Sequence, residues 1–170
     1  MLKQALEKAL EFEKEISLFY LEQGQVATNV LVQKLFLTLS KQEIDHMMHI
    51  LETSGDLERG ASAVEVPPAS SSKVEDAMKE FFLKKRHVLK KDASNAEAIE
   101  MAIDMEKEGC EMYAQFLSQS SVAVEKQFFS QLLDQENEHL ESLLNTHYFL
   151  TGTGDWFEKE ESRVWSWMNQ

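Results

Sequence analysis

Apolar side chains recur at helical spacing along most of the 170-residue chain. In the first stretch, about residues 2–25, apolar residues follow one another three or four positions apart, which places them on one face of a helix. The same period returns over about 30–53, 96–118 and 124–150. The pattern therefore predicts an all-α protein with four long helices. The stripe of the first helix consists of Leu2, Leu6, Ala9, Leu10, Ile16 and Tyr20.

Short polar stretches predict where the first two helices end. Gly24–Asn29 is typical of a turn between the first and second helices. Thr53-Ser54-Gly55 predicts the end of the second helix, because Gly commonly follows a helix C-terminus. Residues 119–123 predict a second tight turn, so the four helices are expected to pair as two hairpins.

A long crossover is predicted between the hairpins, over residues 54–95. It begins with a Gly-, Pro- and Ser-rich linker and contains a short helix at about 74–91. Asp92-Ala93-Ser94-Asn95 resembles helix-capping chemistry before the third long helix. Residues 155–168, which hold three Trp, predict a short aromatic C-terminal helix opened by a capping box.

The two predicted hairpins are copies of each other. A shift of 93 positions aligns them without a gap, with thirteen identities over the 47 positions 5–51. Each copy has a Glu within the apolar stripe of its first helix and Glu-x-x-His on its second helix. Two such hairpins predict a four-helix bundle with a pseudo-twofold axis. The residues conserved between the copies in this way are Glu13, Glu43, His46, Glu106, Glu136 and His139.

These six residues are candidate ligands of two metal ions. A spacing of three puts a carboxylate and an imidazole on one helix face, and a Glu from each of two helices with Glu-x-x-His from the other two is a dinuclear ligand set. Four buried carboxylates would balance two divalent cations, whereas without metal they would have to take up protons. Such oxygen-rich ligation suits iron or manganese, and zinc can also occupy it.

Three further side chains are expected to face the centre. Tyr20 and Tyr113 lie two turns after Glu13 and Glu106 and can donate hydrogen bonds to ligand carboxylates. Cys110, one turn after Glu106, is expected to face inward, mainly as a small core residue. A buried tyrosine whose hydroxyl is satisfied elsewhere is the alternative for each of the two tyrosines.

Composition narrows the class of protein. The net charge of −13 argues against binding to nucleic acid or to an anionic membrane surface, and no apolar run is long enough for a membrane span. The start of the sequence does not resemble a signal peptide. The single cysteine excludes an internal disulfide or a multi-thiolate metal site. We therefore expect a cytoplasmic protein.

The repeated motifs resemble the rubrerythrin branch of the ferritin-like superfamily. The resemblance rests on ALEFEKEISLFY with QEIDH, and on AIEMAIDMEKEGCEMY with QENEH. It implies one ferritin-like domain over residues 1–170, with a diiron centre, a common homodimeric state, and either peroxide reduction or Fe(II) oxidation by oxygen. In that case Glu13 and Glu106 would be terminal ligands, Glu43 and Glu136 bridging ligands, and His46 and His139 capping ligands.

Two features depart from that family pattern. One cysteine cannot build a rubredoxin-type iron site, so electrons are expected to come from an external donor. Rubrerythrins also carry a redox-switching Glu one turn after the third-helix ligand, where this chain has Gly109, which leaves six ligands, as in bacterioferritin. The favoured hypothesis is a diiron oxidoreductase that reduces hydrogen peroxide or dioxygen. The alternatives are an iron-binding protein or ferroxidase with slow oxygen chemistry, and a metal-stabilised structural or interaction bundle.

Overall fold

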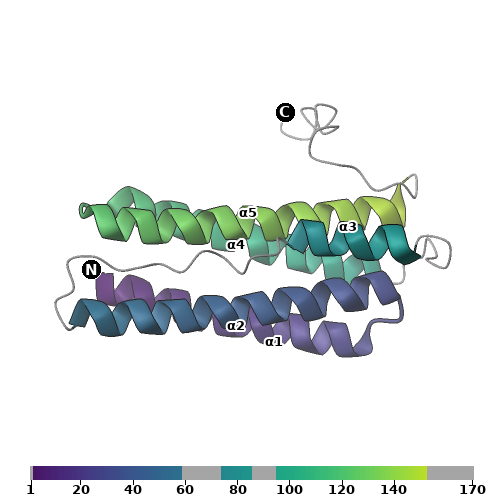
Figure 1. The fold of residues 1–170 in the computed structure, drawn as a ribbon, viewed down its shortest axis with the longest axis horizontal. Helices are drawn as coiled ribbons and strands as arrows, with labels where there is room; N and C mark the ends of the chain where they lie inside the picture. The colour runs from purple at the N-terminus through teal and green to yellow at the C-terminus, as the bar shows by residue number, and fades with distance from the viewer. Residues whose placement is uncertain (1, 59–73, 86–94, 153–170) are drawn as a thin grey trace.

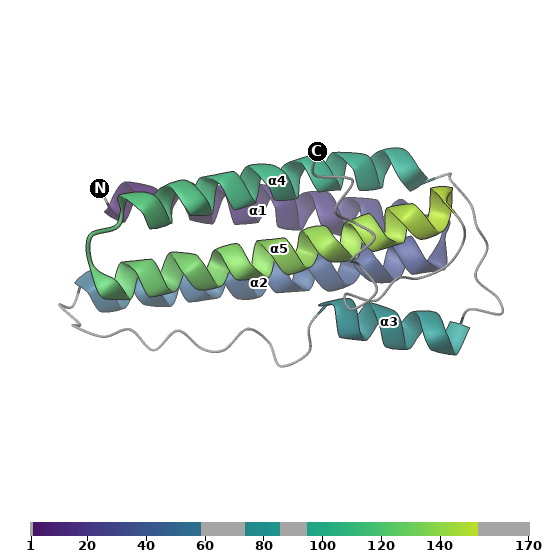
Figure 2. The ribbon, with the colours of Figure 1, turned by 90° about the horizontal axis from the view of Figure 1, so that it is seen from above.

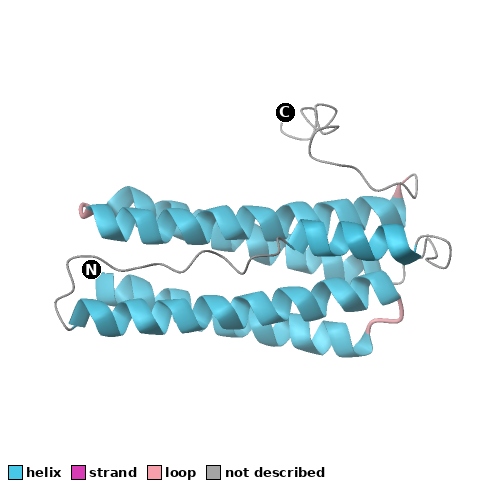
Figure 3. Ribbon diagram, viewed as in Figure 1, coloured by secondary structure: helices cyan, strands magenta, loops and turns pink. Residues whose placement is uncertain are grey.

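The computed structural model describes residues 2–58, 74–85 and 95–152 and contains only helices and short loops in these ranges (Figure 3). Four long helices lie side by side, and a shorter one lies alongside them near one end (Figure 1). The all-α prediction is confirmed for this part of the chain. The helices are α1 (Leu2–Val26), α2 (Val30–Glu58), α3 (Val74–Lys85), α4 (Ala96–Gln119) and α5 (Ala123–Thr151).

The four long helices form two hairpins stacked as two layers. α1 packs along α2, and α4 packs along α5. The layers meet along the α1–α4 and α2–α5 seams, and α3 lies over the α2–α5 seam (Figure 2). This arrangement is the expected four-helix bundle of two hairpins. No helix in the described ranges is long and apolar enough to cross a membrane.

Two apolar clusters fill the bundle, one on each side of its middle. The cluster toward the α3 end includes Ile16, Leu35 and Met78, each fully buried. The cluster toward the opposite end includes Ala9 and Phe129. Burial of these side chains is the main favourable term for folding. The buried charged residues lie between the two clusters, so the middle of the bundle is isolated from water at both ends.

The predicted end of the second helix is wrong, whereas the first helix ends at Val26, close to the predicted position. α2 continues through Thr53-Ser54-Gly55 to Glu58, and the side chain of Thr53 is buried. A single helical Gly costs only about 1 kcal/mol relative to Ala, so it does not end a helix that is otherwise well packed. Gly24, expected in a turn, lies within α1, where a Cβ would stand 2.9 Å from Leu37 Cδ2. That glycine serves close helix packing, and the turn starts three residues later.

The predicted cap at Asn95 has a different role. Asn95 is the residue before α4, but its side chain makes no capping hydrogen bond to that helix. Its Oδ1 instead accepts hydrogen bonds from Asn29 N at 3.1 Å and from Thr28 Oγ1 at 3.3 Å. Asn29 Oδ1 in turn accepts from Leu31 N at 2.9 Å and caps α2. Asn95 therefore joins the start of the second hairpin to the loop of the first.

Several predicted features lie outside the described residues. These are the linker over 59–73, the last part of the helix predicted at 74–91, the proposed cap residues 92–94 and the aromatic helix at 155–168. Within the crossover, α3 covers 74–85, so the short helix predicted there is present. Its side chains Val74 and Met78 are buried against the bundle.

Candidate metal centre

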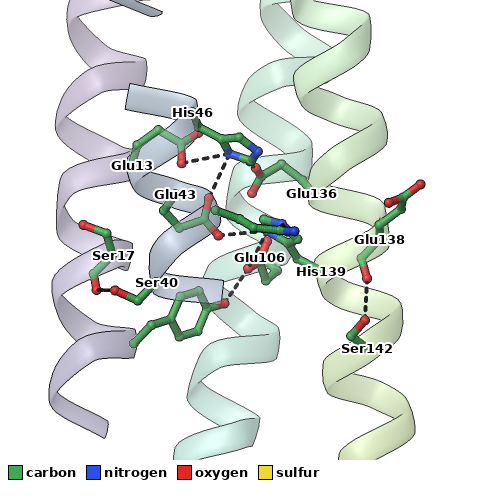
Figure 4. A network of polar contacts seen from close by, with 12 residues as sticks. Glu13, Ser17, Ser40, Glu43, His46, Glu106, Glu136, Glu138, His139 and Ser142 are labelled. Carbon is green, nitrogen blue, oxygen red and sulfur yellow. Dashed lines mark hydrogen bonds and ion pairs between the residues drawn. The ribbon is translucent and has the colours of Figure 1, made fainter. Parts of the chain in front are cut away.

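All six candidate ligands meet at one level in the middle of the bundle (Figure 4). α1 and α4 each supply one Glu, and α2 and α5 each supply the Glu and the His of a Glu-x-x-His motif. The apolar stripes rotate these side chains inward together with the core residues on either side of them. None of the six residues is more than 2% exposed. The residues are Glu13, Glu43, His46, Glu106, Glu136 and His139.

His46 points one ring nitrogen at three carboxylates. Its Nδ1 lies 2.8 Å from Glu43 Oε2, 3.3 Å from Glu13 Oε2 and 3.3 Å from Glu136 Oε1. These oxygens come from three helices, α1, α2 and α5. Such convergence of one nitrogen and three oxygens is the donor arrangement of a metal position.

His139, on the other hairpin, likewise has one ring nitrogen close to two carboxylates. Its Nδ1 lies 2.8 Å from Glu43 Oε1 and 3.5 Å from Glu106 Oε1. The two imidazole rings stack at 5.3 Å with an interplanar angle of 10°. Glu43 thus turns one oxygen to each histidine, and Figure 4 shows it between them.

The donor atoms fall into groups that share carboxylates. Ligand atoms of Glu13, Glu43, His46 and Glu136 all lie within 4.8 Å of one another, as do those of Glu106, Glu136 and His139. Glu136 belongs to both groups, and Glu43 also groups with both histidines. Two neighbouring positions with two shared carboxylates are the geometry that a bridged dinuclear centre requires.

The hydrogen bonding of these carboxylates tests whether a metal fits. Among the described residues, neither oxygen of Glu43 nor of Glu136 has a hydrogen-bond partner of acceptable geometry, and Glu106 Oε2 also lacks one. Buried polar atoms are normally satisfied, and leaving them unpaired costs about 1–3 kcal/mol each. Divalent cations would satisfy all of these atoms at once. The donor set therefore fits two metal ions.

Burial and mutual repulsion set the protonation of the acidic residues. Burial raises the pKa of the Glu13 carboxyl to about 7, although the neighbouring His46 lowers it. Burial and the charges of Glu106 and Glu13 hold the pKa of Glu136 well above its usual range. Burial would also raise the pKa of Glu43, but His139 and His46 outweigh burial and hold it well below its usual range. Protons therefore occupy part of the metal-free cluster at neutral pH.

The two imidazoles also bind protons in the metal-free cluster. Burial lowers the pKa of His46, but Glu13 and Glu43 outweigh it and raise the pKa well above its ordinary value. Burial likewise lowers the pKa of His139, and Glu43 and Glu106 raise it further than burial lowers it. Because a metal needs neutral imidazole and ionised carboxylate, loading must release protons.

The two tyrosines hydrogen-bond across the bundle. Tyr20 donates to Glu106 Oε1, and Tyr113 donates to Glu13 Oε1. The sequence suggested hydrogen bonds to ligand carboxylates, and the structure shows that each joins one hairpin to the carboxylate of the other. Burial first, and then the nearby carboxylates, raise the pKa of both hydroxyls well above 10, so both stay protonated donors.

Cys110 lies at the margin of the centre and not in it. The side chain is half-buried, and Sγ lies 3.7 Å from Asn137 Oδ1 on α5. Burial, together with the charges of Glu136 and Glu106, raises the pKa of its thiol to about 12. The expected inward orientation is only partly realised, and the thiol stays protonated.

Sequence reasoning missed the role of Gln42. Its Oε1 lies 2.7 Å from His139 Nε2, so the imidazole can donate there while its Nδ1 faces the carboxylates. Outer partners of this kind fix the tautomer and orientation of a metal-binding histidine. A signal was available, because Gln42 and Gln135 match in the repeat, each directly before the Glu of Glu-x-x-His.

The comparison with known families agrees with this geometry. The family model described as Rubrerythrin matches residues 4–147, which include both hairpins and all six candidate ligands. No curated protein and no solved structure matches the chain. Since the family match covers most of its length, the chain belongs to the rubrerythrin family.

Proposed function

We propose that this protein is a non-haem diiron oxidoreductase that reduces hydrogen peroxide or dioxygen with electrons from a separate donor. One observation carries the proposal. Three overlapping groups of donor atoms meet there: Glu136 belongs both to the group of Glu13 and His46 and to that of Glu106 and His139, and Glu43 groups with both histidines. Within the described residues neither shared carboxylate makes a hydrogen bond of acceptable geometry, although both imidazoles lie 2.8 Å from Glu43. Membership of the rubrerythrin family supports iron as the metal.

The geometry supports the following assignment of ligands. Glu13 and His46 would hold one ion, and Glu106 and His139 the other, with Glu43 and Glu136 shared between them. Four ionised carboxylates would neutralise two divalent cations within a site that burial isolates from water. When bound, two ferrous ions would supply the two electrons that, with two protons, convert hydrogen peroxide to two waters, or dioxygen to hydrogen peroxide.

The surrounding side chains prepare the ligands for this role. Tyr20 and Tyr113 hold the terminal carboxylates Glu106 and Glu13 by hydrogen bonds, so these groups are positioned before metal arrives. Gln42 holds His139 with its Nδ1 toward the centre. The protons that the metal-free cluster carries on Glu13, Glu136 and the imidazoles leave on loading, which makes metal affinity rise with pH.

The single cysteine bears on the electron source. A rubredoxin-type iron site needs four thiolates, and this chain has only Cys110, whose thiol is protonated and hydrogen-bonds toward Asn137. Regeneration of the ferrous state therefore requires an external reductant, for which an electron-transfer protein is the natural class.

Gly109 favours a second candidate, an iron-binding protein or ferroxidase. This residue stands where rubrerythrins carry a redox-switching Glu. A Cβ at Gly109 would lie 2.8 Å from Glu136 Oε2 and 2.9 Å from Phe12 Cε1, so the position has no space for a seventh ligand. The proposed centre would then have six protein ligands among the described residues, a set that also suits Fe(II) oxidation by oxygen.

Stopped-flow absorbance separates the two candidates. Protein loaded anaerobically with Fe(II) is mixed with hydrogen peroxide or with oxygenated buffer, and the rise of ferric absorbance is followed. The proposal expects oxidation with both oxidants and continued turnover when a chemical reductant is supplied. Faster reaction with peroxide by at least about tenfold identifies a peroxide reductase. Single-turnover oxidation by oxygen alone supports the ferroxidase, and absence of ferric absorbance with either oxidant contradicts both.

A further inference from the structure

The two positions of the candidate metal centre differ, although the residues that build them are duplicated. Around His46, ligand atoms of four residues from three helices lie within 4.8 Å of one another. Around His139 the corresponding group contains three residues, and Glu43, which also approaches His139, is not one of them. The first group is Glu13, Glu43, His46 and Glu136, and the second is Glu106, Glu136 and His139. The position around His46 therefore has the more complete set of donors.

The distances around the two imidazoles differ in the same direction. His46 Nδ1 has three carboxylate oxygens at 2.8 Å, 3.3 Å and 3.3 Å. His139 Nδ1 has one at 2.8 Å and the next at 3.5 Å. When donors already converge, little rearrangement opposes the arrival of an ion, so binding is tighter. The position around His46 is thus the better prepared of the two.

A hydrogen bond from outside the ligand set supports the other position. Gln42 Oε1 lies 2.7 Å from His139 Nε2, and Glu43 Oε1 lies 2.8 Å from His139 Nδ1. Two consecutive residues of α2 therefore hold both nitrogens of a ring that belongs to α5. Because the ring is held at both ends, its orientation is set before any metal binds.

The repeat provides an internal comparison for this hydrogen bond. Gln135 is the copy of Gln42, and His46 is the copy of His139, so the duplication alone would predict a bond between Gln135 and His46 Nε2. No such bond is present among the described residues, where the polar contacts of His46 all use Nδ1. The outer hydrogen bond therefore occurs on one side only, at the position with the less complete donor set.

We propose that the two positions fill in order, the one around His46 first and the one around His139 second, and that the second ion depends on Gln42. This order rests on the proposed dinuclear centre. Gln42 is a positioning residue, because it acts through His139 and touches no metal. The second ion is then the more readily exchanged of the two, and Gln42 determines whether the protein holds one ion or two when metal is scarce.

Anaerobic titration of matched variants with Co(II), followed by visible absorbance, tests the role of Gln42. Gln42→Met keeps the length of the side chain and removes the acceptor, so it should weaken the second binding step about 10–100-fold and change the first less than about threefold. Gln135→Met makes the same change in the repeat copy and should alter neither step by more than about threefold. Gln42→Glu keeps an acceptor oxygen and should hold the second ion at least as tightly as the unaltered protein.

The two terminal ligands identify which position fills first. Glu106→Gln removes a donor from the second position and should change the first step less than about threefold, whereas Glu13→Gln should weaken the first step at least about tenfold. Proton NMR of the Co(II) protein gives a reading that packing alone would not move. The Nε2 proton of His139 should exchange with water at least about tenfold more slowly than that of His46, and Gln42→Met should remove this protection.

Several outcomes would overturn the proposal. Equal losses of the first step in Glu13→Gln and Glu106→Gln would make the positions equivalent, and a loss in Glu106→Gln alone would reverse their order. Equal effects of Gln42→Met and Gln135→Met, or loss of the second ion in Gln42→Glu, would mean that the hydrogen bond to His139 is not what holds the ion. All of these results leave the dinuclear centre in place. Absence of Co(II) binding in the unaltered, folded protein would contradict the proposed function as well.

Discussion

Ile16 in the first hairpin and Gly109 in the second occupy equivalent positions, each three residues after a candidate terminal ligand. Ile16 is fully buried in the apolar cluster at the α3 end of the bundle. At Gly109 there is no side chain, and the Glu136 carboxylate and the Phe12 ring approach the backbone instead. The duplicated ligands are therefore set in different surroundings.

The same contrast holds away from the centre. The six candidate ligands and the two tyrosines are identical in the two hairpins, while the exposed Leu18, Ile44 and Met48 on the outside of the first hairpin are replaced by polar residues in the second. This difference indicates which residues the metal centre constrains and which residues it leaves free to vary. The paired centre requires matching residues from both copies, whereas the neighbours of the ligands and the outer surfaces are free to serve each hairpin separately.

The largest effect is expected at the shared carboxylates. Glu43→Gln and Glu136→Gln each remove a donor from both metal positions, so each should reduce loading from two ions per chain to one or none, with affinity lowered at least about 100-fold. Anaerobic titration with Co(II), followed by visible absorbance, measures both quantities. Glu11→Gln, at an exposed position of α1, is the control. Two tightly bound ions in either centre variant would show that the hairpins do not share the site.

A somewhat smaller effect is expected on the unfolding free energy of the metal-free protein as pH changes. Glu13 has a pKa of about 7 in the folded state and 4.5 when exposed, so its stabilising contribution is complete below 4.5 and is lost as pH rises through 7. The raised pKa values of His46 and His139 act in the same direction, whereas the lowered pKa of Glu43 matters only in acid. Metal-free protein should thus lose up to about 3 kcal/mol of unfolding free energy as pH rises from 5 to 8.

Urea unfolding at a series of pH values checks this expectation. Glu13→Gln should flatten the pH dependence, because the amide cannot ionise, while Glu11→Gln should leave it unchanged. In metal-loaded protein the sign reverses, since binding requires deprotonated ligands and the metal therefore stabilises more at higher pH. A metal-free protein whose stability rises between pH 6 and 8 would contradict the burial argument.

Gly109 gives the third prediction, which addresses the asymmetry directly. In Gly109→Ala the new Cβ must displace Glu136 and Phe12, and we expect a cost of about 2 kcal/mol in unfolding free energy and about tenfold weaker metal binding. Gly24→Ala is the matched control, because Gly24 is also buried in the first helix of its hairpin and its Cβ meets only Leu37. The Leu37 side chain can yield in part, but its backbone N also lies 3.3 Å from the new Cβ, so this control should cost less than Gly109→Ala, about 1 kcal/mol, and leave metal binding unchanged.

Equal effects of the two alanines would mean that the space at Gly109 is not reserved for Glu136. The measurements are urea unfolding of the metal-free protein and Co(II) titration, so the result does not depend on catalytic activity. A selective loss of metal affinity in Gly109→Ala would show that the close approach of Glu136 to the α4 backbone is part of the ligand geometry.

Much of the fold and of the candidate site could be predicted from the sequence, because the duplication marks both. Helical period located all four long helices. The 93-residue shift, combined with the apolar stripes and the Glu-x-x-His spacing, singled out four Glu from the 30 acidic residues and two His from the five histidines of the chain. Gly55 shows where local signals fail. A residue that usually ends helices was overridden by the packing of α2, and such packing is set by residues distant in sequence.

Contacts between hairpins were the least accessible to sequence reasoning. Asn95 was expected to cap its own helix, but its side chain bonds to Thr28 and Asn29, more than 60 residues away. Gln42 likewise contacts a residue of the other hairpin, His139, which no local pattern around Gln42 could indicate. Periodicity gives the face on which a residue lies, but only the assembled bundle determines what that face meets.

The smallest effect is expected at the crossed tyrosines, where the two hairpins behave alike. Tyr20→Phe and Tyr113→Phe each remove one hydroxyl donor, to Glu106 and Glu13 respectively, and should each cost about 1 kcal/mol in unfolding free energy. Because the donors sit at equivalent positions and each spans the hairpins, the two losses should agree within about 0.5 kcal/mol and add in the double variant. Phe19→Leu, at a half-buried neighbour of Tyr20, controls for general repacking. A large difference between the two tyrosine variants in unfolding free energy would show that the hairpins also differ in the hydrogen bonds that orient the ligands, and not only at Ile16 and Gly109.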